Sequence, residues 1–243
     1  TIIGDAIANV YEFLGYGVVR WNYLGDWGTQ FGKLIVAYKL WGKRREVARN
    51  PIEELEKLYV RFHKELKDNP ALEAEGREEF KKLETGDKKN RKLWRWFKKE
   101  SLKEFNRVYN RLGVSFSTQI GEAFYEKELE GIINLLKEEK LTQESEGALM
   151  IELERFDLPP VMIRKSDGAT LYFTREVANL KYRIEEYEPK RILYVVANEQ
   201  TLHFNQLFAV AKMLDLAKGK DMPELAHVKF GLVRGEAGKK LST

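Results

Sequence analysis

The chain has 243 residues, of which 43% are hydrophobic and 12% aromatic, and it carries a formal net charge of +4. This length and composition suffice for a full hydrophobic core and favour one domain with a large insertion. The absence of cysteine excludes disulfide scaffolds, thiolate metal sites and cysteine nucleophiles, and the three widely spaced histidines argue against a histidine metal site.

No apolar run approaches the roughly 20 residues that cross a bilayer, and no signal peptide opens the chain. We therefore expect a cytoplasmic protein without a membrane partner. The chain begins without Met inside an apolar helical pattern and stops after a Gly-Lys-Lys loop, so we expect it to be part of a longer protein.

The two ends of the chain each read as half of a wound α/β sheet. Apolar residues recur with helical spacing over residues 2–14, a strand is predicted over 18–24, and a second helix follows with one apolar face. Near the other end, residues 192–197 are continuously apolar, as expected for a parallel strand buried on both faces, and a helix is predicted just after them.

Between these halves the chain becomes highly charged. Residues 43–111 contain 21 Lys and Arg against 14 Asp and Glu, yet their apolar residues keep helical spacing, which predicts an inserted helical bundle. Its basic surface could face phosphates, with Arg91, Lys92, Arg95 and Lys98 as candidates, or could simply be a solvated face. Trp94 and Trp96 are better explained by packing than by stacking on bases.

Shorter segments follow the insertion. We predict a strand over 114–116, a helix over 125–138, and strands over 148–153 and 161–164, with a break at the Pro159-Pro160 pair. Residues 165–168 read as a hairpin turn that leads into another strand over 170–173.

Polar residues beside the strand-like segments are candidate ligands, because a wound sheet presents such side chains to a crevice. Glu122, Glu176 and Gln200 fit this description, although each alone could be a helix cap or surface residue. Two converging acids would suit a guanidinium, whose planar donors a carboxylate accepts in pairs. Glycines and lysines over 231–240 form a basic loop that suits a polyphosphate but is also common on surfaces.

The segment NYLGDWGTQFG at residues 22–32 is the most informative one. By spacing alone it could be an ordinary strand-to-helix turn capped by Asp26. As a string it closely resembles arginyl-tRNA synthetases, and further segments resemble the same family in the same order: TIIGD at 1–5, Gly121-Glu122, KSDGATLYFTRE at 165–176, YVVANEQTLHF at 194–204 and HVKFGLVRG at 227–235.

This resemblance implies an α/β fold with the Rossmann-like, HUP-type parallel sheet of class I synthetases, split by a mainly helical insertion. The implied segments are a first part of the core at 1–42, the basic insertion at 43–111, a connective region at 112–165 and a second part of the core at 166–243. The implied activity is arginine–tRNA ligation: ATP activates L-arginine to arginyl-adenylate, and the arginyl group passes to tRNA(Arg). ATP is a substrate accompanied by Mg²⁺, we expect no dedicated protein metal site, and we expect a monomer.

The resemblance also carries site residues. The family's arginine-binding positions fall on Glu122, Tyr172, Glu176 and Gln200, and its adenine-side segment falls on His227, Phe230, Gly231, Leu232 and Val233. Lys240 and Ser242 match the start of the family's KMSK-like loop and are the implied catalytic residues. Asp26, Gln30 and His203 are expected to line the crevice. No general base is needed, because adenylation depends on positioning and charge neutralisation.

Three departures from the family pattern leave alternatives open. Glu176 stands where the family has Asp, and Ser117 lies where an acid is usual. The family's HIGH motif would lie before Thr1, and the KMSK-like loop would continue past Thr243, so we expect this piece alone to be inactive. A degenerate synthetase paralogue that acts as an RNA-binding or regulatory module, and another Rossmann nucleotidyl-transfer enzyme, are the competing interpretations.

Overall fold

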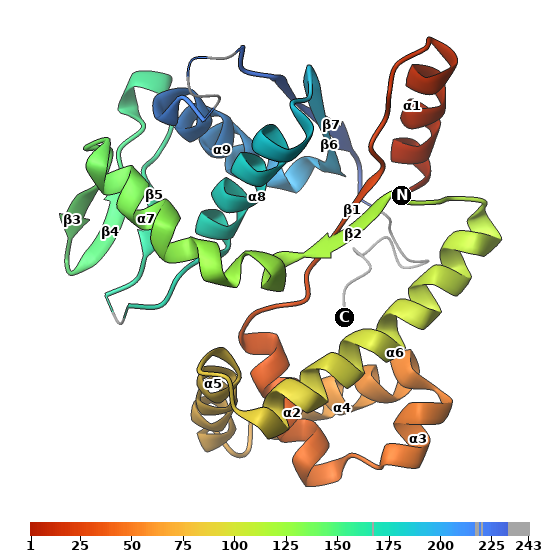
Figure 1. Ribbon diagram of the computed structural model, residues 1–243. Helices are drawn as coiled ribbons and strands as arrows, with labels where there is room; N and C mark the ends of the chain where they lie inside the picture. Colours follow the sequence, from red (N-terminus) through yellow and green to blue (C-terminus); the bar gives the residue numbers. More distant parts are fainter. Residues whose placement is uncertain (167, 217–218, 220, 233–243) are drawn as a thin grey trace. The chain divides into compact units, whose positions relative to one another are not determined.

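The computed structural model describes residues 1–166, 168–216, 219 and 221–232 (Figure 1). They form two compact units, one from Thr1 to Gly121 and one that begins at Glu122. Each unit contains a pair of parallel strands together with helices. Along the described residues, no helix combines the length and the apolar character that a membrane span requires.

The first unit consists of one strand pair and the helices around it, in the chain order α1 (Ile2–Phe13), β1 (Trp21–Leu24), α2 (Thr29–Trp41), α3 (Arg44–Arg49), α4 (Pro51–Glu65), α5 (Ala71–Glu84), α6 (Lys88–Leu112) and β2 (Thr118–Gly121). Strands β1 and β2 are parallel, with Trp21 opposite Thr118 and Leu24 opposite Gly121. The predicted strand over 114–116 is wrong, because pairing with β1 begins only at Thr118. That position depends on long-range register rather than on local β-propensity.

Helix α1 is held to the segment before β1 by one arginine. The guanidinium of Arg20 donates to Asp5 at 2.5 Å, to Asn9 at 2.6 Å and to Glu12 at 2.8 Å, three acceptors spaced along the same helix. Gly15, with φ of +88°, lies in the turn after the helix, where a left-handed backbone conformation favours glycine. The predicted helix over 2–14 and its glycine stop are therefore confirmed.

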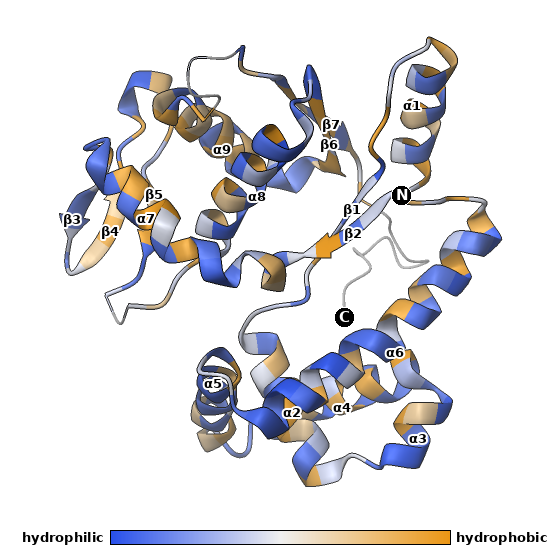
Figure 2. Cartoon of the chain, in the orientation of Figure 1, coloured by the Kyte–Doolittle hydropathy of each residue, from blue (hydrophilic) through white to orange (hydrophobic). Residues whose placement is uncertain are grey.

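Helices α2, α4, α5 and α6 pack together through side chains that the helical periodicity places inward (Figure 1). Fully buried examples are Ile35, Phe62, Leu83 and Phe97. Hydrophilic residues predominate on the outer faces of these helices, as Figure 2 shows. The side chain of Asp87 caps α6 by accepting from two backbone N–H groups, and Gly113 ends the helix at φ of +68°.

The second unit contains two sheets with helices between them, in the order η1 (Glu122–Glu128), α7 (Leu129–Glu138), β3 (Gln143–Ser145), β4 (Ala148–Ile151), η2 (Glu154–Phe156), β5 (Val161–Arg164), α8 (Tyr172–Tyr187), β6 (Arg191–Ala197), η3 (Asn198–Gln200), α9 (Thr201–Leu214) and β7 (Glu224–Phe230). Strands β3, β4 and β5 form an antiparallel sheet, and β6 and β7 pair in parallel. The helix predicted over 125–138 begins as the 3₁₀ segment η1 and becomes α-helical at Leu129.

The predicted strand over 170–173 is also wrong. The turn before it exists, since the N–H of Gly168 donates to the carbonyl of Lys165, but Thr170 makes only an isolated bridge to Arg164 and α8 begins at Tyr172. Burial explains this outcome, because α8 packs against η1, α7, β5 and α9 and buries side chains along most of its length. Tertiary packing overrides the β-propensity of the local sequence.

Strand β6 is parallel, as predicted, and α9 follows within a few residues. Its predicted burial on both faces is wrong: Tyr194 is buried, whereas its neighbours along the strand keep part of their exposure. The described elements therefore cover this strand pair incompletely.

Candidate active site

The Gly-Asp turn after β1 is tied into the first unit. The backbone N–H of Asp26 donates to the carbonyl of Leu24 at 2.9 Å, which turns the chain sharply at the end of the strand. The carboxylate of Asp26 pairs with Lys98 of α6 at 2.5 Å, and its carbonyl accepts from the indole N–H of Trp94 at 2.7 Å. Asp26 is only 5% exposed. Because of its contacts with Lys98 and Trp94, the turn that resembles a binding loop also connects the end of β1 to α6.

Two glycines of the same segment lie where a side chain would be strained or would clash. Gly28 has φ of +131° directly before α2, a conformation that L side chains rarely adopt. Gly32 lies where α2 crosses α5, and a Cβ there would come within 2.8 Å of the Phe80 backbone nitrogen. Gln30 is exposed in the first turn of α2, and its amide donates to the Trp27 carbonyl at 2.8 Å. Whether Asp26 and Gln30 line a crevice stays a prediction.

Three of the four predicted arginine-binding residues come together in the second unit. Glu122 opens η1, while Tyr172 and Glu176 lie four residues apart and thus on one face of α8, which packs against η1. Both carboxylates are buried, Glu122 at 9% and Glu176 at 1% exposure, whereas Tyr172 exposes 43% of its surface. The two acids therefore belong to an interior cluster that opens to solvent beside a tyrosine.

The pKa of the Tyr172 phenol is raised by burial and by the charges of both acids. Burial of its hydroxyl raises the pKa of Tyr172 above the ordinary value, the charge of Glu176 and a hydrogen bond to its carboxylate raise it further, and the charge of Glu122 adds to the same direction. Arg183 opposes the shift, but more weakly. Negative potential therefore prevails at this hydroxyl, a setting that favours a cationic ligand.

His203 connects this cluster to the end of β6. The centroid of its ring lies 5.1 Å from that of the Tyr172 ring. His203 follows Gln200, the last residue of η3, by three positions in α9. Burial, with a smaller contribution from the charge of His227, lowers the pKa of His203 to about 4. Gln200 itself is exposed where β6 gives way to α9, and its predicted contact with arginine stays a prediction.

The predicted adenine-side residues lie at the end of β7. His227 packs on Phe204 at 4.6 Å between ring centroids, and its Nε2 lies 2.9 Å from the carbonyl oxygen of Val196. A carbonyl can only accept, so Nε2 carries a hydrogen and donates it to Val196. Within the described part of the chain, neither Nδ1 of His227 nor Nε2 of His203 has a hydrogen-bond partner.

The other predicted residues of this region divide between described and undescribed positions. Phe230 ends β7, and Gly231 and Leu232 follow it directly. Val233, Lys240 and Ser242 lie outside the described residues, as does Asp167 of the turn before α8. Among the described residues, no group of three or more His, Asp or Glu is arranged to hold a metal ion.

Helix α6 presents the main basic surface of the first unit. It contains ten Lys and Arg against two Glu. Two of the four candidate phosphate-binding residues make contacts within the protein. Lys98 pairs with Asp26, and the guanidinium of Arg91 lies 4.8 Å from the centroid of the Trp27 ring. Five of the exposed basic residues recur at intervals of four, three, four and four residues and so share one face: Lys88, Lys92, Arg95, Lys99 and Lys103, the last of which also pairs with Glu100 at 2.7 Å. We call these five residues the α6 stripe.

The tryptophans of α6 belong to the protein core and its edge. Trp94 is 9% exposed and makes an edge-to-face contact with Trp27, with 5.3 Å between the ring centroids. Trp96 packs against Tyr38 at 5.5 Å. The prediction that both rings serve packing is confirmed.

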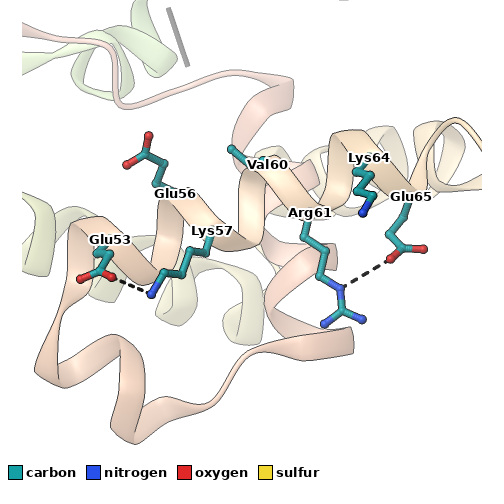
Figure 3. Close-up of a pocket in the computed structure, with 7 residues that line it drawn as sticks. All are labelled: Glu53, Glu56, Lys57, Val60, Arg61, Lys64 and Glu65. Carbon is teal, nitrogen blue, oxygen red and sulfur yellow. Dashed lines mark ion pairs between the residues drawn. The ribbon is translucent and has the colours of Figure 1, made fainter.

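A shallow hollow on α4 has a different character. Figure 3 shows its seven lining residues, all on one helix, with Glu53 paired to Lys57 and Arg61 paired to Glu65. Ion pairs between residues four apart are typical of a solvated helix face and contribute little energy. This hollow lies in the first unit and includes none of the predicted site residues.

The sequence and the fold match those of known proteins. The chain matches, over residues 1–243, the family described as tRNA synthetases class I (R), catalytic domain. It therefore belongs to this family of class I synthetases, and the family resemblance noted from its motifs is confirmed.

The individual relatives are arginine-specific by name. The chain is 53% identical over its whole length to the arginine–tRNA ligase of Exiguobacterium sibiricum and 51% identical to that of Streptococcus suis. It spans 43% and 42% of the lengths of these two relatives. The matched region is thus less than half of each curated protein.

Solved structures agree on the fold. The crystal structure of arginyl-tRNA synthetase from Plasmodium falciparum matches 96% of this chain and 39% of its own, with a TM-score of 0.80 and 32% identity. The Thermus thermophilus arginyl-tRNA synthetase matches 98% of this chain and 45% of its own, with a TM-score of 0.71 at 18% identity, which speaks to the fold alone. The predicted Rossmann-like α/β class is confirmed.

Sequence reasoning missed the partners of the Gly-Asp turn. A Cβ at Gly121 would lie within 3.0 Å of the carboxyl carbon and both oxygens of Asp26, so these residues are in close contact although they are far apart in the chain. The sequence places Lys98 among candidates for a basic surface, whereas in the structure its ammonium pairs with this carboxylate. No local signal in the sequence identifies either contact.

Proposed function

We propose that the protein containing this chain is an arginine–tRNA ligase. It activates L-arginine with ATP to arginyl-adenylate and pyrophosphate and then transfers the arginyl group to tRNA(Arg). The observation that carries this proposal is the pair of buried carboxylates, Glu122 and Glu176, at the hydroxyl of Tyr172. Family membership and the names of the relatives support it.

The acid pair suits the guanidinium of arginine. Each carboxylate can accept two parallel N–H bonds from a planar guanidinium, and low exposure strengthens such charge-assisted bonds. We propose that Glu122 and Glu176 receive the guanidinium and that the Tyr172 hydroxyl and the Gln200 amide satisfy further polar groups of the amino acid. Glu176 replaces a shorter Asp of the family, and its position on the fixed face of α8 would compensate for the additional methylene.

Activation then follows from placement. A carboxylate oxygen of arginine attacks the α-phosphorus of ATP, the bond from that phosphorus to the bridging oxygen breaks, and pyrophosphate leaves. The Mg²⁺ that accompanies ATP neutralises charge on the phosphates. The protein contributes orientation, with no proton to remove from the attacking carboxylate.

The ATP side is proposed on the family resemblance. Backbone groups from His227 to Val233 would receive the adenine, and Lys240 and Ser242 would stabilise the phosphates in the transition state. The unpartnered Nδ1 of His227 and Nε2 of His203 support a polar ligand beside β7. We also propose, on the same resemblance, that the protein acts as a cytoplasmic monomer and that residues 43–111 are an insertion in its core.

The α6 stripe is the proposed contact for tRNA. Its five residues extend over fifteen residue-to-residue steps of the helix, or roughly 22 Å at 1.5 Å per step, so they can meet several successive phosphates. Exposure of all five supports this role. Lys98 and Arg91 are left out of it because they contact Asp26 and Trp27.

Arginine-dependent exchange of pyrophosphate into ATP in the presence of tRNA(Arg) tests the proposal, measured on the full-length gene product. We expect exchange with arginine, and a loss of about 100-fold or more in kcat/KM for arginine in Glu176→Ala or Gln200→Ala. The matched control is Glu185→Ala, an acid of the same helix that pairs with Lys181 on the surface, which should stay within about twofold of the wild type. Exchange with another amino acid but not with arginine would refute the specificity.

The tRNA contact has its own test. Changing Lys88, Lys92, Arg95 and Lys99 to Gln should weaken tRNA binding and lower the slope of log affinity against log salt by about three. The control changes Lys43, Lys57, Arg61 and Lys64 of the α3 and α4 surface to Gln, which removes the same charge and should leave that slope nearly unchanged. Equal effects of both sets would contradict a directed contact.

The second candidate function is an RNA-binding module without ligase activity. The observation that favours it is the α6 stripe. Salt-dependent RNA binding by a full-length protein that shows no exchange with any amino acid would establish this alternative and reject the ligase.

A further inference from the structure

The best-defined contact that the proposed function does not use is the junction of Asp26, Lys98 and Gly121. Asp26 follows β1, Gly121 ends β2, and Lys98 comes from the middle of α6. Because Leu24 pairs with Gly121 across the two strands, the tight turn at Asp26 returns its carboxylate onto the backbone of Gly121. Three separate segments of the first unit therefore meet at one buried carboxylate.

The contact with Gly121 leaves no room for a side chain. The three atoms nearest to a Cβ at this position are the carboxyl carbon and the two oxygens of Asp26, all within 3.0 Å. The carboxylate thus lies directly on the Cα of the residue that precedes Glu122. Any movement of Asp26 changes the space available to the peptide that carries Glu122.

Asp26 in turn is fixed from α6. Its Oδ2 lies 2.5 Å from the ammonium of Lys98, and its carbonyl accepts the Trp94 indole N–H at 2.7 Å. Lys98 also lies over the ring of Trp94 at 5.5 Å, so the cation is held on two sides. Since the side chain of Asp26 is 6% exposed and that of Lys98 28%, removal of the ammonium would leave a buried carboxylate without its cation.

We propose that Asp26, held by Lys98, is a positioning residue that sets the Gly121–Glu122 junction and through it the arginine-binding carboxylate of Glu122. This inference rests on the proposed arginine–tRNA ligase activity. Neither Asp26 nor Lys98 touches the substrate in this account. They act through the backbone of Gly121, which is bonded directly to Glu122.

The first test compares two lysines in the full-length protein. Lys98→Met should raise KM for arginine in pyrophosphate exchange about tenfold and change KM for ATP by less than threefold, because displacement of a binding group by a fraction of an ångström is costly. Lys98→Arg, which retains the charge, should restore KM for arginine to within threefold. The control is Lys39→Met, which breaks the pair of Lys39 with Glu79, whose side chain is 14% exposed, among the helices of the same unit. It should leave both KM values within twofold.

The second test is a double-substitution cycle that does not depend on activity. Gly121→Ala should strongly increase hydrogen exchange of the β1 and β2 amides in the wild-type background, and much less in Asp26→Ala, where the obstructing carboxyl is gone. Additive effects would overturn the contact. Equal rises in KM for arginine in Lys98→Met and Lys39→Met, or parallel rises for arginine and ATP, would overturn the positioning role.

The two proposals fail in different ways. If the wild type shows no arginine-dependent exchange, the ligase proposal fails. The proposed effect of Asp26 and Lys98 on arginine binding then fails too. The cycle then still decides whether Asp26 sets the backbone of Gly121. If exchange is present but Lys98→Met behaves like its control, only the positioning role is refuted.

Discussion

Gly32→Ala is the substitution whose effect the structure defines most closely. Gly32 lies in α2 at its crossing with α5, and an added Cβ would overlap the carbonyl oxygen of Gly76 and approach the Cβ and N of Phe80 to 2.7 and 2.8 Å. These are backbone atoms or the first side-chain carbon, so no rotamer change relieves the overlap. The two helices must move apart.

The magnitude follows from two opposing effects. Overpacking of a close helix contact costs about 1–3 kcal/mol, and the better helix propensity of Ala returns up to about 1 kcal/mol. The expected net loss is about 1–2 kcal/mol, which corresponds to roughly a 5- to 30-fold increase in local opening. Gly131→Ala is the matched control, because Gly131 lies exposed in α7 with nothing within 4 Å of the added Cβ. It should stabilise its helix by about 0.5–1 kcal/mol.

Hydrogen exchange read by mass spectrometry measures both effects in one protein. Protection of α2 and α5 amides should fall in Gly32→Ala while that of α7 stays constant, and protection of α7 should rise in Gly131→Ala. Unchanged protection of α2 and α5 in Gly32→Ala would refute the close crossing that explains the last glycine of the NYLGDWGTQFG segment.

Two further predictions concern single side chains. Burial and the charge of His227 lower the pKa of His203 to about 4 from 6.5, so His203 contributes stability above pH 6.5 that is lost as the pH falls toward 4. His203→Gln should therefore flatten the pH dependence of thermal unfolding in this window, and an unaltered profile would count against the buried neutral ring. Arg20→Met should release α1 by removing its bonds to Asp5 and Glu12 and raise exchange of α1 amides about tenfold, whereas equal protection in both proteins would show that apolar contacts alone hold the helix.

Local periodicity predicted those elements whose packing follows from their own sequence. The helix over 2–14, the strand over 161–164 and the core position of Trp94 are examples. In each case the apolar spacing or the residue type by itself specifies which face is buried.

Elements that depend on distant partners differ from the sequence-based predictions. The β-rich string from Thr170 to Phe173 gives way to α8, although the spacing of Phe173, Val177, Leu180 and Ile184 carries a helical signal. The start of β2 at Thr118 is set by its register with Trp21. The contact of Asp26 with Gly121 and Lys98 requires the whole first unit to fold, so no window of sequence could contain it.

The candidate site shows the same division. Position beside strand-like segments makes Glu122 and Glu176 candidate ligands, whereas Tyr172 and the arginine-binding role come from the family resemblance. The meeting of these residues depends on α8 packing against η1. Composition and spacing alone left each acid as a possible cap or surface residue. Resemblance therefore supplied the role of these residues, and tertiary structure explains why two carboxylates and a phenol share one environment.

Two buried carboxylates that select a guanidinium should discriminate strongly between arginine and citrulline, in which a neutral ureido group of similar shape replaces the cation. Pyrophosphate exchange by the full-length protein compares the two amino acids. We expect kcat/KM for arginine to exceed that for citrulline by about 10⁴ or more, because citrulline would leave buried charge unpaired. Comparable values for the two amino acids would contradict it.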